Sequence, residues 1–268
     1  MYDKAIESAA RIIAEAKYAV AFSGAGMSAE SGIPTFRDPG GIWDRFDPAE
    51  VGTSEGIIQL AMRQPERIRD FLLEAVDTFE KADPNPGHYG LAELEKMGIL
   101  HSVVTQNIDD FHTIAGNTRV FEVHGNLYRF RCLSCGKAEK HTRDEVLAKV
   151  NDVLDAPNFE VQNLLEIVPQ CMCGGIMRPD VVMFGEAVQQ MGESYNEARS
   201  CDVMLVLGTS GVVWPAAGVP YEAAKAKAKV VEINPTTSAF SDISDVWVEA
   251  PSGEAMPRIM DLVKELRS

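Results

Sequence analysis

The chain has 268 residues, of which 46% are hydrophobic and 24% are charged, and its formal net charge is −15 at pH 7. This length and apolar content suffice for a full core in one large domain, alone or with a smaller one, so they argue against a disordered chain. The acidic balance disfavours nucleic-acid binding through a basic surface and would attract cationic partners, with acidity that serves solubility alone as the alternative.

Apolar, strand-like runs occur at 18–22, 99–104, 203–207 and 229–233. Helical patterns lie between or beside them, at 3–16, 64–81, 87–97, 190–199, 215–227 and 254–266. This alternation predicts an α/β fold with a parallel sheet and helices on both faces. The stretches 40–85 and 128–177 fit the alternation poorly, and we expect them to form a smaller domain, which leaves 1–39, 86–127 and 178–268 for the large one.

No apolar run is long enough to cross a bilayer, and the N-terminal residues lack the basic and apolar regions of a signal peptide. We therefore expect a cytoplasmic protein with no membrane contact.

A glycine-rich turn follows the first predicted strand. Gly24, Gly26 and Ala29 fall on the G-x-G-x-x-G/A spacing of dinucleotide-binding turns, which present backbone N–H groups to an anion. A turn of this kind that binds nothing is the alternative. Gly32 and the prolines and glycines after it interrupt any helix within two turns, so Arg37 would lie on a loop that can fold over a ligand.

Polar segments also follow the other predicted strands. They are 105–109, 208–210 and 234–235. Because ligands of open α/β sheets bind outside the carboxyl ends of the strands, we expect these segments to line one crevice, although each alone is more often a turn or a helix cap.

Four of the five cysteines form two close pairs, Cys132 with Cys135 and Cys171 with Cys173. In a chain without an export signal this pattern favours thiolate ligation of one zinc ion over disulfides, with reduced free thiols as the alternative. The second pair has one intervening residue instead of two, so His141 is a replacement ligand if one cysteine cannot reach. Four protein ligands would make the zinc structural.

The motifs together closely resemble the sirtuins, in order over nearly the whole chain. They are 24–28 with 32–37, 105–109, His124-Gly125, the cysteine pairs, 178–182 with 184–186, and 208–210. Sirtuins are NAD-dependent protein-lysine deacylases with a Rossmann-type large domain and a small domain made of a helical insertion and a zinc module. The resemblance implies a deacetylase that transfers the acyl group from lysine to ADP-ribose and releases nicotinamide.

Two alternatives share this scaffold. One is a mono-ADP-ribosyltransferase, in which another nucleophile captures the same carbon, and the other is a non-catalytic module that binds NAD or a peptide. As partners we expect acylated lysine side chains of proteins, in basic segments, and no nucleic acid. The sequence gives no expectation of the oligomeric state.

The resemblance also assigns site residues. His124 would be the catalytic base, with a structural histidine as the alternative. Asn107 and Asp109 would hold the nicotinamide carboxamide and the adjoining ribose of NAD. The contacts with NAD would be Gly24, Ala25, Gly26, Ser28, Ala29, Phe36, Arg37, Gln106, Asn107, Ile108, Asp109, Gly208, Thr209, Ser210 and Asn234. The acylated peptide would contact Val181, Val182, Phe184, Gly185 and Glu186, with a buried strand as the alternative.

Two positions bear on specificity and charge. Sirtuins that prefer acidic acyl groups carry a Tyr-x-x-Arg pair, whereas the nearest equivalent here is Phe71-Leu72-Leu73-Glu74, which favours acetyl or longer apolar groups over succinyl. Asp110, directly after Asp109, would raise a carboxylate pKa or face solvent.

Overall fold

The computed structural model describes residues 2–35, 44, 46–156 and 159–268. Its largest sheet in the described chain has six parallel strands in the order β3-β2-β1-β7-β8-β9. The strands are β1 (Ala19–Ser23), β2 (Leu100–Thr105), β3 (Val120–Glu122), β7 (Val203–Leu207), β8 (Lys229–Ile233) and β9 (Val246–Val248). The predicted fold class is confirmed, and the four predicted strands lie within one residue of their expected bounds.

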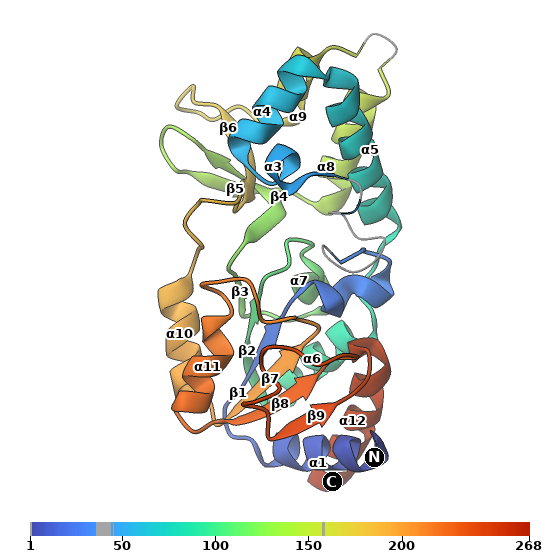
Figure 1. The fold of residues 1–268 in the computed structure, drawn as a ribbon, viewed down its shortest axis with the longest axis vertical. Coiled ribbons are helices and arrows are strands. Elements are labelled where there is room, and N and C mark those ends of the chain that lie inside the picture. Colours follow the sequence, from blue (N-terminus) through green and yellow to red (C-terminus); the bar gives the residue numbers. More distant parts are fainter. Residues whose placement is uncertain (1, 36–43, 45, 157–158) are drawn as a thin grey trace.

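Helices cover both faces of this sheet (Figure 1). One face packs against α1 (Tyr2–Glu15), α6 (Pro86–Lys96) and α12 (Ser252–Arg267), and the other against α10 (Met191–Ser200) and α11 (Gly218–Lys225). The side chains of β1 alternate accordingly, since Ala19 and Ala21 belong to the first core and Val20 and Phe22 to the second. A strand buried on both faces reads as a continuous apolar run, which is why the sequence predicts it.

A smaller unit lies at the other end of the molecule (Figure 1). It contains the antiparallel sheet β5-β4-β6, formed by β4 (Gly125–Cys132), β5 (Ala138–Lys140) and β6 (Met177–Val181). The helices of this unit are α3 (Pro48–Val51), α4 (Ser54–Arg63), α5 (Pro65–Lys81), α8 (Arg143–Leu154), η2 (Val161–Asn163) and α9 (Leu164–Ile167). The domain boundaries predicted from the sequence stay a prediction.

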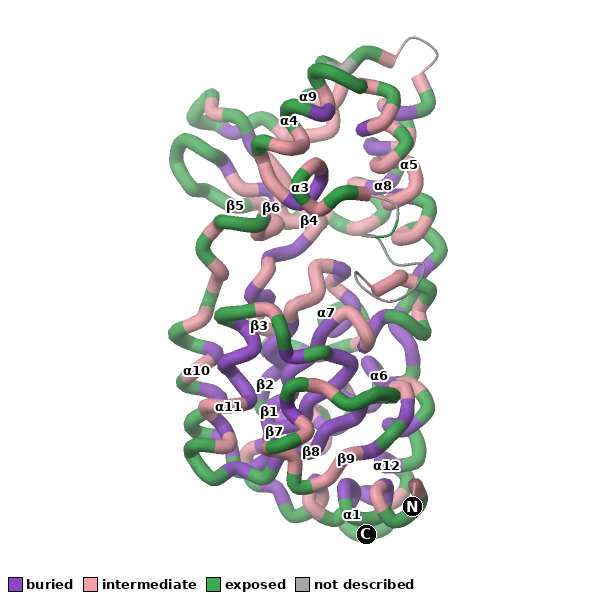
Figure 2. Tube along the Cα trace, viewed as in Figure 1, coloured by how far each residue is buried: buried purple, intermediate pink, exposed green. Residues whose placement is uncertain are grey.

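Burial differs between the two units. Figure 2 shows that buried backbone gathers around the parallel sheet, whereas the smaller unit is mostly half-buried or exposed. None of the helices in the described chain combines the length and the apolarity that crossing a membrane requires.

The buried carboxylate of Asp180 in β6 ties together the strands that join the two units. It accepts hydrogen bonds from Arg129 Nε at 2.6 Å, Arg131 Nε at 2.8 Å and Gln189 Nε2 at 2.9 Å. Burial would raise the pKa of this carboxyl, but the hydrogen bonds from Arg131, Arg129 and Gln189 outweigh it and lower the pKa. The ionised form is therefore favoured by folding.

We expect Asp180→Asn to lower the free energy of unfolding by about 1.5–3 kcal/mol at pH 7, because two guanidinium groups lose a charged acceptor. The folded-state pKa is depressed, so the stabilisation is present above the unfolded pKa of about 3.9 and is lost as the pH falls through the folded value. Denaturant unfolding at pH 7 and at lower pH measures both effects.

The exposed Asp261→Asn is the matched control and should change the unfolding free energy by no more than about 0.5 kcal/mol. Equal stability of the Asp180 and Asp261 variants at pH 7 would contradict the assignment.

Candidate functional site

The turns after β1 and β7 touch through their backbones. Gly26 N–H donates to the Gly208 carbonyl at 2.8 Å, and Gly24 N–H donates to the Leu207 carbonyl at 3.2 Å. A Cβ on Gly26 would lie 2.8 Å from the Gly208 oxygen, and one on Gly24 would lie 2.7 Å from Thr209 Cβ. Both glycines are thus required by the contact between the two turns, which holds the backbone expected to face pyrophosphate.

A short 3₁₀ helix, η1 (Ala25–Ser31), continues from this turn. It ends at Gly32, whose backbone is left-handed at φ 92°. The expected interruption of the helix within two turns is found. Phe36 and Arg37, predicted to contact NAD, lie outside the described residues.

Ser28, Asn107 and Asp109 form one hydrogen-bonded group. Ser28 Oγ donates to Asp109 Oδ2 at 2.7 Å, and Asn107 Nδ2 donates to Ser28 Oγ at 3.0 Å. Asp109 is only 4% exposed. The group places an amide, a hydroxyl and a carboxylate side by side, which together can both donate to and accept from a carboxamide or a ribose.

The pKa of Asp109 is raised, chiefly by burial. The hydrogen bonds from Ser28 Oγ and from the Phe111 N–H oppose this effect, and the charge of Asp110 adds to it. The expected influence of Asp110 is therefore found, as a smaller cause than burial.

His124 follows β3 and lies next to the loop after β2. Its Nδ1 is 3.1 Å from the Gln106 carbonyl oxygen. Since that oxygen only accepts, Nδ1 carries the proton and Nε2 is left with a lone pair. Burial lowers the pKa of His124, against the opposing hydrogen bond to Gln106, so the imidazole is neutral at physiological pH. This tautomer is suited to a general base.

Ser23, Thr105 and His112, to which the sequence analysis assigned no individual role in the site, form hydrogen bonds that support it. Thr105 Oγ1 accepts from the Asn107 N–H at 3.1 Å and from Ser23 Oγ at 2.8 Å. Ser23 Oγ also lies 2.8 Å from Nε2 of His112, whose pKa burial lowers to about 4. The available signal was a polar residue at the end of each apolar strand, Ser23 in β1 and Thr105 in β2.

Further residues expected to contact NAD lie at the ends of β7 and β8. Asn234 Nδ2 donates to the Thr209 carbonyl at 3.0 Å, and Gln106 Nε2 donates to Thr209 Oγ1 at 3.0 Å. Thr209 thus connects the loops after three strands. Ser210, its neighbour, is exposed.

The segment expected to bind peptide leaves β6 next to His124. Val182 N–H donates to the His124 carbonyl at 2.9 Å, and Phe184 N–H donates to the Gly52 carbonyl at 2.8 Å. The Phe184 side chain is 51% exposed. Glu186 pairs with Arg178 at 2.6 Å, and Val181 closes the ladder of β6 with β4 opposite Gly125.

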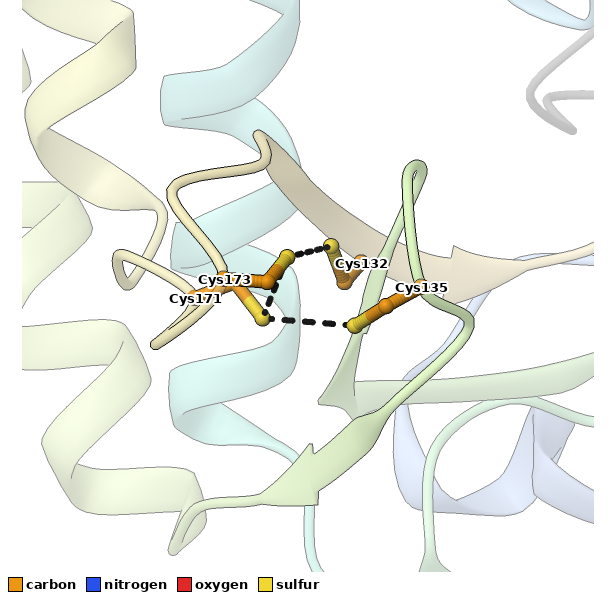
Figure 3. Close-up of side chains that lie close together, drawn as sticks. All are labelled: Cys132, Cys135, Cys171 and Cys173. Atoms are coloured by element: carbon orange, nitrogen blue, oxygen red, sulfur yellow. Dashed lines mark hydrogen bonds between the residues drawn. The ribbon is translucent and has the colours of Figure 1, made fainter.

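The four paired cysteines converge at the end of the small sheet (Figure 3). Their sulfur atoms all lie within 4.8 Å of one another, with Cys132–Cys173 at 3.5 Å, Cys135–Cys171 at 3.6 Å and Cys171–Cys173 at 3.4 Å. A tetrahedral zinc ion with Zn–S bonds of about 2.3 Å needs sulfurs about 3.8 Å apart. Both thiols of the C-x-C pair are therefore placed where they could ligate one ion together with Cys132 and Cys135, and the arrangement does not call on His141 as a replacement.

Comparisons with known proteins agree on one family. The model of the Sir2 family matches residues 24–215. An NAD-dependent protein deacylase of Desulfosudis oleivorans is 50% identical over 268 residues, covering 99% of this chain and 98% of the relative. The chain belongs to the Sir2 family. The predicted resemblance to sirtuins is confirmed.

Two solved Sir2 structures share the fold. A Sir2 homologue in complex with NAD has 35% identity and a TM-score of 0.78, over 98% of this chain and 95% of that one. Sir2Af2, bound to a myristoylated histone peptide, has 35% identity and a TM-score of 0.73, over 99% of this chain and 98% of the other.

We expect Gly26→Ala to weaken NAD binding by this Sir2 protein more than about tenfold, because the new Cβ forces the turns after β1 and β7 apart. Calorimetric titration with NAD measures the effect. Gly192→Ala is the control, since a Cβ there meets nothing within 4 Å. Unchanged NAD affinity of the Gly26 variant would show that the turn is not part of the site.

We expect about one zinc ion per chain, and loss of the zinc in Cys135→Ser, because a neutral hydroxyl is a poor replacement for a thiolate. Elemental analysis of purified protein measures this. Ser134→Ala, next to the ligands, should retain zinc. A folded, active wild-type protein with far less than one zinc per chain would contradict the assignment.

Proposed function

We propose that this protein is an NAD-dependent protein-lysine deacylase, which moves the acyl group from lysine to ADP-ribose and releases nicotinamide. The observation that carries the proposal is the Ser28–Asn107–Asp109 group beside a neutral His124, in a chain of the Sir2 family. The relative from Desulfosudis oleivorans is named an NAD-dependent protein deacylase, which supports the same activity here.

NAD supplies an anomeric carbon that loses nicotinamide and is attacked by the amide oxygen of the acyl-lysine. Asn107 and Asp109 hold the carboxamide and the adjoining ribose, and Ser28 fixes both side chains. His124 then takes a proton from a ribose hydroxyl through Nε2, which lets the acyl group move onto ADP-ribose. The remaining predicted contacts bind the phosphates and the adenosine along the ends of β1, β7 and β8.

The peptide lies extended along residues 181–186, with its backbone paired to this segment, so binding makes little demand on sequence. Basic segments are favoured as substrates because the protein carries a net charge of −15. Affinity for such peptides should therefore fall as salt increases.

The acyl group is acetyl or a longer apolar chain. In α5, Phe71 packs edge-to-face on Phe46 with ring centroids 4.8 Å apart, and Leu72 and Leu73 pack against the core of the small unit. These positions present no cation to a succinyl carboxylate. Sir2Af2 was solved with a myristoylated histone peptide, which supports a long apolar acyl group as an alternative to acetyl.

The proposal also covers the domain organisation of the chain and its location in the cell. The large domain comprises 1–39, 86–127 and 178–268, and the small domain comprises 40–85 and 128–177. Reduced thiolates that hold zinc fit a cytoplasmic protein, since the cytosol keeps cysteines reduced.

The test is incubation with NAD and each of three matched basic peptides carrying acetyl-, myristoyl- or succinyl-lysine, followed by mass spectrometry. Deacylated peptide, nicotinamide and O-acyl-ADP-ribose in equal amounts support deacylation. ADP-ribose attached to protein while the acyl group stays in place would favour ADP-ribosyl transfer. Intact NAD with all three peptides would favour a binding module.

We expect kcat/KM to fall as the pH drops through the pKa of His124, because only the neutral imidazole accepts a proton. Since burial places that pKa below 6.5, the acidic limb of the profile should have its midpoint below pH 6.5. Rates measured from pH 5 to 8 locate the limb.

His124→Ala should lower deacylation by about 10²–10⁴-fold and abolish this limb. Exchange of labelled nicotinamide into NAD should persist in the variant, because the base acts after nicotinamide leaves. Loss of exchange together with deacylation would place His124 in binding instead.

A further inference from the structure

Two cations face each other in the small sheet. Arg129 of β4 and Lys140 of β5 are direct partners in the antiparallel register. Like charges at such a position are destabilising unless each has its own counter-ion. Arg129 Nη1 pairs with Glu122 at 2.5 Å and Lys140 Nζ pairs with Asp110 Oδ1 at 2.8 Å. The zinc-bearing sheet thus reaches two carboxylates beside the large sheet.

Asn126 and its neighbour reinforce this connection. Asn126 is fully buried, and its Nδ2 donates to Asp110 Oδ1 at 3.0 Å and to Glu122 Oε1 at 2.5 Å. Leu127 N–H donates to the Ile108 carbonyl at 2.9 Å. The start of β4 is therefore bonded to two successive parts of the loop that carries Asn107 and Asp109.

Asp110 holds an unusual backbone conformation. Its φ of 65° and ψ of 7° place a residue other than glycine in the left-handed region, where it begins α7 (Phe111–Ala115). Aspartate and asparagine adopt this region more readily than most residues, but a left-handed residue persists only where its surroundings hold it. Its contacts with Lys140 and Asn126 supply that restraint, one residue after Asp109.

We propose that the Lys140–Asp110 ion pair is a positioning contact through which the zinc module holds Asn107 and Asp109 in the geometry that binds the nicotinamide end of NAD. The inference deepens the proposed function and rests on it for the identity of the ligand. In this proposal Lys140 and Asp110 make no contact with NAD and act through the loop 107–110.

Solvent reaches the Lys140–Asp110 ion pair, so its strength should depend on the ionic strength of the solution. The side chain of Lys140 is 43% exposed and that of Asp110 is 11% exposed. Lys140 lines an open surface cavity of about 480 Å³ together with Thr113, Asn117 and Glu122. Dissolved ions therefore reach the ammonium group, and the contribution of the pair should decrease with ionic strength.

The test compares Asp110→Asn, Lys140→Met, Lys140→Arg and the double variant Asp110→Asn/Lys140→Met with wild type. Asparagine keeps the left-handed backbone and removes the charge, methionine keeps the apolar length of lysine, and arginine keeps the charge. Lys137→Met is the matched control, because Lys137 pairs with Glu139 at 2.8 Å within the same hairpin and does not reach the large sheet.

We expect Asp110→Asn and Lys140→Met each to raise the Kd for NAD and the inhibition constant of nicotinamide about three- to tenfold. The KM for acyl peptide should stay within about twofold, a split that general destabilisation would not produce. The double variant should bind NAD no more weakly than either single variant, and Lys140→Arg should stay within about twofold of wild type.

High salt should reduce the difference in Kd for NAD between the wild type and Lys140→Met, because dissolved ions weaken the ion pair in the wild type. Zinc content is measured in every variant. If Lys140→Met loses zinc, the NAD affinity of Asp110→Asn alone tests the proposal, since Asp110 lies outside the zinc module. Unchanged NAD affinity of Asp110→Asn, additive effects in the double variant, or an equal effect of Lys137→Met would overturn the proposal.

Calorimetric titration with NAD does not require deacylation. The proposed function and the proposed positioning contact can therefore be rejected independently of each other. Wild-type protein that binds NAD but deacylates no peptide would reject the proposed function and leave the variants interpretable. Normal deacylation with unaffected variants would reject the positioning contact alone.

Discussion

The backbone contact between the turns after β1 and β7 determines where the candidate site lies. Gly26 N–H reaches the Gly208 carbonyl, and neither turn has room for a side chain at that point. Because β1 and β7 are adjacent parallel strands, their carboxyl ends already lie together, and the contact fixes the direction in which each chain leaves the sheet. Ser28 is thereby brought against Asp109, and Thr209 against Gln106.

Burial sets the chemistry of the two titratable groups at this edge. It raises the pKa of Asp109 and lowers the pKa of His124, so desolvation disfavours charge on both. Hydrogen bonding divides their roles. Asp109 is held by Ser28 and by a backbone N–H, which favour its ionised form, whereas His124 is held in one tautomer by a carbonyl oxygen. One group is thus suited to binding and the other to proton transfer.

The sequence predicted the parts of the structure that depend on local pattern. Val203–Leu207 was predicted with its observed bounds because a strand buried on both faces is continuously apolar. Polar residues lie at or just after the ends of β1, β2, β7 and β8 because each apolar run ends where its strand reaches the edge of the sheet, so these positions were also predicted from local pattern. The expected contacts with NAD and peptide stay predictions, and Phe36 and Arg37 lie outside the described residues.

Elements that depend on distant partners were not predictable in this way. β9 has three residues between Asp245 and Glu249, so it is too short to be distinguished from a loop without its pairing to β8. The Ser23–His112 contact joins residues 89 positions apart and has no local signature. The cysteine cluster lies between these cases, since spacing selected the four cysteines and only the fold shows that the C-x-C pair reaches the same point as Cys132 and Cys135.

The link between the two units depends on ion pairs, and the pattern of apolar residues in the sequence therefore did not predict it. Arg129 and Lys140 have no local sequence feature that identifies their partners, yet Arg129 pairs with Asp180 across β4 and β6, and Lys140 of β5 pairs with Asp110 in the loop after β2. An apolar contact there would fix the two units equally well but would leave Glu122 and Asp110 without cations. The requirement to compensate those carboxylates ties the loop of Asn107 and Asp109 to the sheet that carries the cysteine cluster, so this cluster and the candidate site form one connected structure.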